Sequence, residues 1–241
     1  MRSRLLALCL ALAAGGAALL SVGSPAVQAA DAADVHKTLL DSAGWTLVST
    51  DSEDGLKVYK KHIASLGADA FMGEKVLDPG VDDQVLFGLI SDVANHDRVT
   101  PNLHASESLS KTAAGEDYYQ VAKAPKMLPV SERYWFNRAV NTINADGTVG
   151  HLRRSWQTID ASTYPTDLSH ITTTWPDAVR IPFTYGMWEV VPNSSGPSSL
   201  VYRTVSDPGG EIPGWVMSSL TSRTLPDNMR TFERAALKVS Q

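Results

Sequence analysis

The sequence predicts one α+β domain whose strands form an antiparallel sheet. Strand-like segments follow one another for roughly a hundred residues after Pro101, with turn signals between them. Helical patterns stand before and after these strands instead of alternating with them, which separates this fold class from parallel α/β folds. With 43% hydrophobic and 20% charged residues, the chain is apolar enough to build a core. No internal repeat or long linker divides it, so we expect a single domain.

The N-terminal segment is predicted to be a leader that lies outside the fold. Two arginines precede an apolar stretch over residues 5–22, and residues 27–29 provide small side chains at the usual cleavage spacing. This layout is typical of a secretory signal peptide. We therefore expect a signal peptide over residues 1–29 and a secreted or periplasmic mature chain over residues 30–241. An uncleaved membrane anchor is the alternative, because the apolar stretch approaches the length that spans a bilayer.

Composition excludes several classes of function. The full chain has 26 acidic and 21 basic residues, a formal charge of −5 and one cysteine, Cys9. Cleavage after residue 29 shifts the charge to −7 and leaves no cysteine for a disulfide, a thiolate nucleophile or a metal. Since the basic residues form no cluster, we expect no nucleic-acid partner. The histidines lack the spacing of a metal-binding motif, so we expect neither a metal nor a cofactor.

The first third of the mature chain predicts two helices and three strands. Helical spacing followed by Gly44 indicates the first helix, and Asp82 supplies an N-cap for the second. The polar run at residues 51–55 is a hairpin signal between the first two strands. The predicted helices span residues 34–42 and 82–90, a short helical turn spans 93–98, and the strands span 45–50, 56–62 and 71–77.

The region after Pro101 predicts a run of strands and a terminal helix. Asn-Ala-Asp-Gly at residues 144–147 and Asn-Ser-Ser-Gly at residues 193–196 are strong turn signals. Two amphipathic segments close the chain, and Pro226 between them is predicted to kink or restart the helix. The predicted strands span residues 103–110, 118–124, 133–143, 149–159, 169–175, 184–191 and 200–206.

Three segments together resemble the StAR-related lipid-transfer (START) family. Residues 45–59 place a tryptophan before a turn and a Val-Tyr strand, and Phe-Met-Gly-Glu follows at residues 71–74. Residues 124–135 resemble the proline-rich turn that leads into an Arg-Asp-aromatic strand, although Tyr134 stands at the aspartate position. Residues 207–215 resemble the Gly-Gly-x-Ile-Pro entry into the last helix. The order and spacing of these segments carry the resemblance, which covers almost the whole mature chain.

The resemblance implies a helix-grip fold, in which a curved antiparallel sheet wraps around a long C-terminal helix and encloses an apolar cavity. It further implies binding of a sterol, a phospholipid or another hydrophobic molecule, usually without chemistry. We expect transfer of a lipid or sterol, gating of the cavity by that helix, transient membrane contact and a monomeric state. The turn at residues 207–214 is then a hinge for the helix, or a fixed connector. A helix-grip cyclase or hydrolase acting on a hydrophobic substrate is the first alternative, because related proteins include such enzymes. A ligand-gated accessory protein whose terminal helix signals to a partner is the second.

Aromatic residues in the expected cavity region are the first candidates for ligand contacts. Apolar pockets are commonly lined by such side chains, and the same side chains also fill ordinary cores. The candidates are Trp135, Trp156, Trp188, Tyr202 and Trp215.

Three arginines on predicted strands are the remaining candidates. Strand alternation places Arg133 on one face with Trp135 and Asn137. It places Arg154 with Trp156, and Arg203 with Val201 and Val205. An arginine among apolar neighbours must be paired or hydrogen-bonded. Each one therefore meets the polar group of a ligand, or pairs with an internal carboxylate such as Glu74 or Glu189.

The most enzyme-like cluster is His96-Asp97-Arg98, with His104 nearby. A histidine beside a carboxylate suits general acid–base catalysis. Adjacent residues on a helical turn point in different directions, however, and the segment has the composition of a solvated connector. We therefore predict no catalytic residue.

Overall fold

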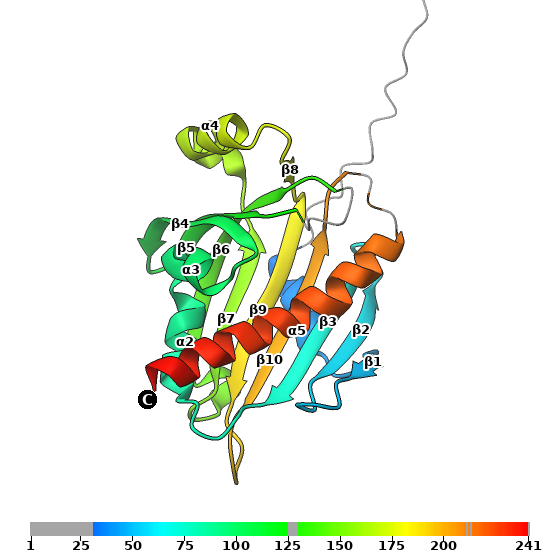
Figure 1. Ribbon diagram of the computed structural model, residues 1–241, viewed down its shortest axis with the longest axis vertical. Helices are drawn as coiled ribbons and strands as arrows, with labels where there is room; N and C mark the ends of the chain where they lie inside the picture. The colour runs from blue at the N-terminus through cyan, green and yellow to red at the C-terminus, as the bar shows by residue number, and fades with distance from the viewer. Residues whose placement is uncertain (1–30, 125–129, 211, 213, 241) are drawn as a thin grey trace, which may run out of the picture.

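The structure is a computed structural model that describes residues 31–124, 130–210, 212 and 214–240, and only the backbone of residues 214–223. In these residues, ten strands form one curved sheet in the order β1-β2-β3-β10-β9-β7-β6-β5-β4, and β8 pairs with β6 outside this path (Figure 1). The pairs along the path are antiparallel, and the short β6–β8 pair is parallel. The predicted leader lies outside the described residues.

The chain order of the elements confirms the prediction of an α+β fold. The strands are β1 (Thr46–Thr50), β2 (Lys57–Ile63), β3 (Ala68–Val76), β4 (Leu103–Thr112), β5 (Gly115–Ala122), β6 (Arg133–Ile143), β7 (Leu152–Thr158), β8 (Val179–Arg180), β9 (Phe183–Val191) and β10 (Ser199–Asp207). The helices are α1 (Ala32–Leu40), α2 (Asp83–Ser91), α3 (His96–Val99), α4 (Pro165–Thr174) and α5 (Gly214–Val239).

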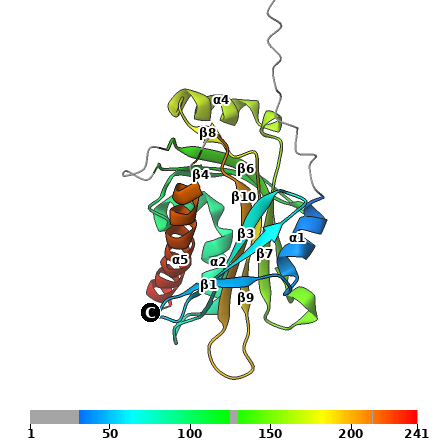
Figure 2. The ribbon, with the colours of Figure 1, turned by 90° about the vertical axis from the view of Figure 1, so that its right-hand side faces the viewer.

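Helix α5 lies in the concave face of the sheet, and α2 packs beside it (Figure 2). Its inward face buries Leu225, Met229, Phe232 and Ala236 in the main hydrophobic cluster. The helix approaches β3 so closely that a Cβ at Gly73 would lie 2.4 Å from Met229 Sδ. This is the helix-grip arrangement that the sequence resemblance implied.

Ion pairs also hold the C-terminal part of α5 to the sheet. Glu233 pairs with Lys75 of β3 in a buried contact, and Arg230 pairs with Asp51 at 2.5 Å and with Asp54 at 2.9 Å. The two aspartates belong to the turn between β1 and β2, which the sequence predicted. Helix α5 is therefore anchored to β3 and to the first hairpin by charge as well as by apolar packing.

Helix α1 covers the opposite face of the sheet (Figure 2). Asp31 caps its N-terminus, because the carboxylate accepts a hydrogen bond from the backbone of Ala33 at 2.9 Å. Val35 and Leu39, one turn apart, are buried against β2, β3, β9 and β10. The sheet is thus covered on both faces, and its interior strands are correspondingly apolar.

The prediction of a strand over residues 169–175 is wrong, because this stretch forms most of helix α4. Its threonines and isoleucine favour a strand locally. Pro165 opens the helix at a position where a missing N–H is tolerated, and Ile171 is fully buried against the outer face of β5 and β6. Leu168, Ile171 and Trp175 share that face at helical spacing, so tertiary burial overrides the local preference.

Pro226 was predicted to kink or restart the terminal helix, and the restart is wrong, since α5 runs through this residue without a break. Pro226 removes one backbone donor in the helix interior. The buried side chains on both sides of it, Leu225 and Met229, hold the helix against the sheet. Among the residues described here, no helix has the length and apolar character needed to cross a membrane.

Candidate ligand-binding cavity

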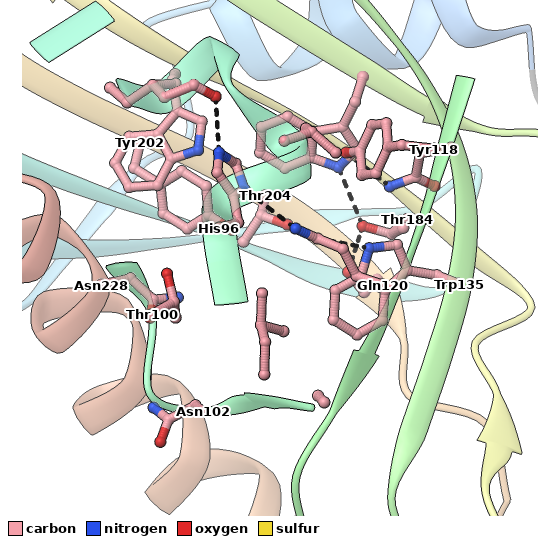
Figure 3. Close-up of a pocket in the computed structure, with 18 of the residues that line it drawn as sticks. His96, Thr100, Asn102, Tyr118, Gln120, Trp135, Thr184, Tyr202, Thr204 and Asn228 are labelled. Atoms are coloured by element: carbon pink, nitrogen blue, oxygen red, sulfur yellow. Dashed lines mark hydrogen bonds between the residues drawn. The ribbon is translucent and has the colours of Figure 1, made fainter. Parts of the chain in front are cut away.

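A cavity of about 230 Å³ lies between the sheet and α5 (Figure 3). Strands β5, β6, β7, β9 and β10 form its floor, and α5 covers it with Thr224, Asn228 and Phe232. Apolar and aromatic side chains are half of the described lining residues and polar side chains the other half, while apolar atoms provide the larger share of the wall surface, as in sites for apolar ligands. The aromatic lining residues are Tyr118, Trp135, Trp156, Trp188, Tyr202 and Phe232.

Three stacked aromatic rings cross the centre of the sheet. Trp156 of β7 stacks on Tyr202 of β10 with ring centroids 5.6 Å apart, and Tyr202 stacks on Trp188 of β9 at 4.1 Å. Strand β9 lies between the other two strands and places Gly186 opposite Trp156. Because a Cβ at Gly186 would lie 2.3 Å from the Trp156 ring, glycine is needed for the indole to lie across β9.

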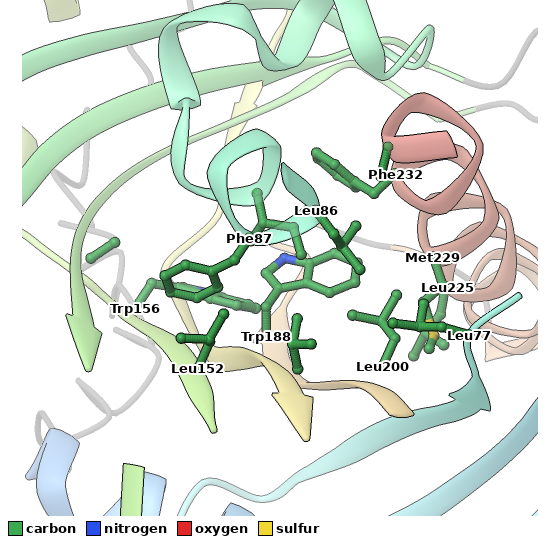
Figure 4. Close-up of a cluster of buried hydrophobic side chains, with 14 of the residues drawn as sticks. Leu77, Leu86, Phe87, Leu152, Trp156, Trp188, Leu200, Leu225, Met229 and Phe232 are labelled. Carbon is green, nitrogen blue, oxygen red and sulfur yellow. The ribbon is translucent and has the colours of Figure 1, made fainter. Parts of the chain in front are cut away.

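The aromatic row continues into the hydrophobic cluster under α5. Trp188 meets Phe232 of α5 edge to face at 5.4 Å, and Figure 4 shows both rings among Leu86, Phe87 and Leu200. The wall of the cavity is therefore continuous with the main core, and the position of α5 determines the size of the cavity.

A fully paired network of polar groups forms another part of the wall. The Gln120 amide nitrogen donates to His96 Nδ1 at 3.0 Å and to Ser106 Oγ at 2.9 Å. Gln120 Oε1 accepts a hydrogen bond from the Trp135 indole at 3.1 Å, and Ser106 donates to the Val93 carbonyl at 2.6 Å. Each of these groups has a partner of the required kind, so burial of the network is tolerated.

The network fixes the protonation of His96. Its Nε2 donates to the Ile90 carbonyl at 3.0 Å, which leaves Nδ1 as the acceptor for Gln120. Burial, with a smaller contribution from the Arg154 charge, lowers the pKa of His96 to about 4 against the opposing effect of the backbone carbonyls. The imidazole is therefore neutral at pH 7 and has no nitrogen free for a ligand.

Arg154 is buried in the cavity wall and is neutralised there. Its guanidinium donates to Glu116 Oε2 and to Asn141 Oδ1, both at 2.8 Å. Burial alone would raise the pKa of Glu116, but hydrogen bonds from Ser108 and Arg154 outweigh it and hold the pKa below its usual range. Glu116 also pairs with the exposed Lys111 at 3.1 Å. The pair therefore brings no uncompensated charge to the cavity.

Asn137 and Tyr118 face each other across β6 and β5. Asn137 Nδ2 donates to the Tyr118 hydroxyl at 3.2 Å, while Asn137 Oδ1 is buried and has no hydrogen-bond partner. Burial raises the pKa of Tyr118, so its hydroxyl keeps its proton. Both residues line the cavity, and they are its least satisfied polar pair.

The structure brings five of the predicted site residues together in the cavity wall. These are Trp135, Trp156, Trp188, Tyr202 and Arg154. The side chain of Trp215 lies outside the described part of the chain. Whether any of these residues contacts a ligand stays a prediction.

Arg133 lies outside the cavity lining, contrary to the expectation for a ligand contact. Its Nε donates to the Pro208 carbonyl at 2.7 Å, and an Nη donates to the Gly209 carbonyl at 3.2 Å. At the beginning of β6, the side chain reaches the turn after β10 instead of the sheet face. Arg133 therefore holds the connector that leads into α5.

Arg203 also lies away from the cavity, on the opposite face of the sheet from Tyr202. Successive residues of a strand point to opposite faces, so Tyr202 and Arg203 cannot both line the same cavity. Arg203 pairs with the buried Glu189, which also accepts a hydrogen bond from Arg153 at 2.9 Å. Arg203 was predicted to meet either a polar group of the ligand or an internal carboxylate, and in the structure it pairs with an internal carboxylate, Glu189.

The same cluster contains a group that could suit a cation, since Asp146, His151 and Glu189 offer ligand atoms within 4.8 Å of one another. Arg153 already binds both carboxylates, and Arg203 pairs with Glu189 as well. A metal ion would have to displace these guanidinium groups, so the charges favour an ion-pair cluster over a metal centre.

Sequence reasoning missed much of the polar wall. The interpretation of His96 as part of a solvated connector is wrong, because His96 is 9% exposed and lines the cavity. Gln120 was not predicted as a site residue, although alternation in β5 places its side chain on the same face as Tyr118. Alternation did place Asn137 on the face of Trp135, and this signal identifies it once the cavity side is known.

The sequence and the fold were compared with those of known proteins. No protein-family model matches the sequence. An uncharacterized protein of Pseudomonas aeruginosa is 26% identical over 196 residues, which cover 80% of this chain and 87% of that protein. The solved STAR-related lipid transfer protein of Xanthomonas axonopodis is 24% identical, with a TM-score of 0.63 and coverage of 80% of this chain and 98% of that one.

Human StAR-related lipid transfer protein 5 is 16% identical, with a TM-score of 0.68 and coverage of 87% of this chain and 98% of that one. The fold is thus that of a helix-grip protein. Within that class, the chain has the fold of StAR-related lipid-transfer domains. This confirms the fold that the sequence resemblance implied.

Proposed function

We propose that this protein binds a hydrophobic small molecule, a lipid or sterol, in the cavity beneath α5 and transfers it between membranes or carriers. The observation that carries the proposal is an aromatic-walled cavity of about 230 Å³ between the sheet and the terminal helix. Burial of apolar ligand surface supplies roughly 25 cal/mol per Å² removed from water. The similarity of the fold to lipid-transfer domains supports the same function.

The proposed role is binding without chemistry. His96 is neutral and uses both ring nitrogens within the protein, and Arg154 is paired with Glu116. These polar groups are therefore committed to structure and do not favour a cyclase or hydrolase. A recovered ligand that is chemically unchanged after incubation with the protein would agree with this role.

Cavity filling tests the binding site. Purified mature protein should release a hydrophobic molecule on solvent extraction, detected by mass spectrometry. Thr204→Phe places a ring in the cavity and should abolish this ligand load. Thr173→Phe, the same substitution on the exposed side of α4, is the matched control and should retain it. Equal ligand in all three proteins, or none in the wild type together with no binding of added lipid, would contradict the proposal.

Gating by α5 is testable with a reversible crosslink. A Cβ at Gly73 would lie 2.4 Å from Met229 Sδ, so a Gly73→Cys/Met229→Cys crosslink would join β3 and α5 where the two elements are in direct contact. If α5 must leave β3 to admit ligand, oxidation should block ligand exchange and a reducing agent should restore it. The single-cysteine variants are the controls. Exchange at an unchanged rate in the crosslinked protein would exclude this gate.

The proposed location is outside the cytoplasm, and its support is the leader sequence alone. N-terminal sequencing of the exported protein should begin at Ala30; an intact N-terminus in a membrane fraction would favour the anchor. Because the mature charge is about −7, we expect only brief contact with anionic membranes. Vesicle flotation and gel filtration test this contact and the proposed monomeric state.

A further inference from the structure

The cavity wall has no free charge with which to bind an ionised ligand. Among its described lining residues, Arg154 is the charged one, and Glu116 neutralises it at 2.8 Å. The neighbouring imidazole of His96 is neutral because both nitrogens are fixed in hydrogen bonds of opposite kind. An ionised carboxylate or phosphate entering this cavity would lose its hydration and gain no counter-charge, which is strongly unfavourable.

The wall does leave two hydrogen-bonding positions open. Asn137 is 1% exposed, and its Oδ1 has no partner. The Tyr118 hydroxyl accepts from Asn137 Nδ2 and retains a proton, for which the described residues supply no acceptor. An unpartnered buried acceptor beside an unused donor is costly unless a ligand or water completes both.

These two positions match the chemistry of one kind of group. A hydroxyl both donates and accepts, so it would donate to Asn137 Oδ1 and accept from Tyr118. Rotation of the amide by half a turn would exchange the roles of Asn137 oxygen and nitrogen. A hydroxyl still complements the pair in that orientation, whereas a hydrocarbon or an acceptor-only carboxylate does not.

The position of this pair sets the orientation of the ligand. Figure 3 shows Tyr118 on the side of the cavity opposite Asn102 and Asn228, and Asn102 is the exposed member of the three. The buried pair therefore lies at the inner end. A cavity of about 230 Å³ has room for a small ring system or for one end of a longer ligand.

We propose that Asn137 and Tyr118 form a polar subsite for a single neutral hydroxyl group, so that the ligand class is an apolar alcohol or phenol and not an ionised fatty acid or a phospholipid headgroup. This proposal rests on the proposed function, because it assigns chemistry to the same cavity. It makes Asn137 and Tyr118 the residues that discriminate among hydrophobic molecules of similar shape, while the aromatic wall supplies affinity.

Three probes that share one ring system separate the contribution of apolar burial from that of a hydroxyl group and of a charge. Naphthalene, 2-naphthol and 2-naphthoate are titrated into the full mature protein by isothermal titration calorimetry at pH 7. The wild type should bind 2-naphthol about ten-fold more tightly than naphthalene, the effect of one or two neutral hydrogen bonds. It should bind 2-naphthoate more weakly than 2-naphthol by at least the same factor.

Two variants assign the effect to the pair. Asn137→Leu should bring the naphthol-to-naphthalene ratio close to one, and Tyr118→Phe should lower the ratio several-fold. Tyr119→Phe is the matched control, because Tyr119 follows Tyr118 on β5 and packs on the opposite face. It should keep the wild-type ratio. Thermal unfolding of each variant verifies the fold, and Tyr118→Phe decides the matter if Asn137→Leu does not fold.

Several outcomes overturn the subsite. A wild-type ratio near one, a ratio that survives both variants, or tightest binding of 2-naphthoate would each remove it. In those cases naphthalene still binds, so the proposed function stands without the subsite. Failure of all three probes, together with no extractable lipid, would instead remove the cavity as a ligand site and the subsite with it.

Discussion

The buried ion pair between Lys75 of β3 and Glu233 of α5 offers a sharp test of how the terminal helix is held. The two side chains are 4% and 3% exposed. Glu233 Oε1 also accepts a hydrogen bond from the Asp78 backbone at 2.9 Å. Burial alone would lower the pKa of Lys75, but the hydrogen bond to Glu233 and the charges of Asp78 and Asp54 raise it instead. The lysine is therefore charged and dependent on its partners.

Replacing Glu233 with leucine should destabilise the protein by about 3 kcal/mol, because removal of one partner leaves a buried charge uncompensated. Asp54 at 3.6 Å and Asp78 at 3.4 Å still face Lys75, which places the expected effect at the lower end of the range for such pairs. For a chain of this size, this corresponds to a decrease in Tm of roughly 6–12 °C.

The double variant Lys75→Met/Glu233→Leu should recover most of this loss and unfold within about 1 kcal/mol of the wild type, since apolar residues of similar volume replace the whole pair. Urea unfolding followed by circular dichroism at pH 7 measures all four proteins of the cycle. A loss below about 0.5 kcal/mol for Glu233→Leu, or additive losses in the double variant, would refute the view that this pair holds α5.

Three further predictions follow from the cavity wall. Burial lowers the pKa of His96 to about 4, so between pH 6.5 and pH 4 the unfolded chain takes up a proton that the folded chain does not. The free energy of unfolding should therefore fall by about 3 kcal/mol as the pH is lowered over this range. Urea unfolding at a series of pH values measures this decrease, and His96→Gln should make it smaller. A wild-type profile retained in that variant would contradict this. Gly186→Ala should destabilise the protein by about 2 kcal/mol and weaken 2-naphthol binding, because its Cβ would lie 2.3 Å from the Trp156 ring. Gly88→Ala is the control: it has open space around it in the interior of α2, so it should leave 2-naphthol binding unchanged and stabilise the protein by up to about 1 kcal/mol in thermal unfolding. Arg154→Met should lower the Tm and leave 2-naphthol affinity unchanged, and the reverse pattern in calorimetry would make Arg154 a ligand contact.

Local patterns in the sequence predicted most of the elements. Asp82 caps α2 as expected, with its carboxylate 2.8 Å from the backbone nitrogen of Gln84. The prediction of a strand over residues 169–175 was wrong, because the threonines and the isoleucine of this segment favour a strand locally. The burial of Ile171 against β6 determined its helical state, and that contact joins segments distant in the sequence.

For the candidate site, the sequence predicted which strand residues share a face of the sheet and no more. Alternation in a strand tells which residues share a face, and it correctly grouped Trp135 with Asn137 and Arg154 with Trp156. It does not tell which face encloses the cavity. Arg203 was therefore chosen together with its neighbour Tyr202, although the two point to opposite sides of the sheet.

The sequence by itself determined the α+β class, most of the strands and the amphipathic character of the terminal helix, because these depend on residues close together in the chain. Tertiary structure alone decided that β10 pairs with both β3 and β9 and brings Tyr202 between Trp156 and Trp188. It alone decided that Glu116 neutralises Arg154 and that Asn137 keeps an unpaired oxygen. The chemistry of the cavity depends on such pairings, since distant residues acquire partners only when the sheet closes around α5.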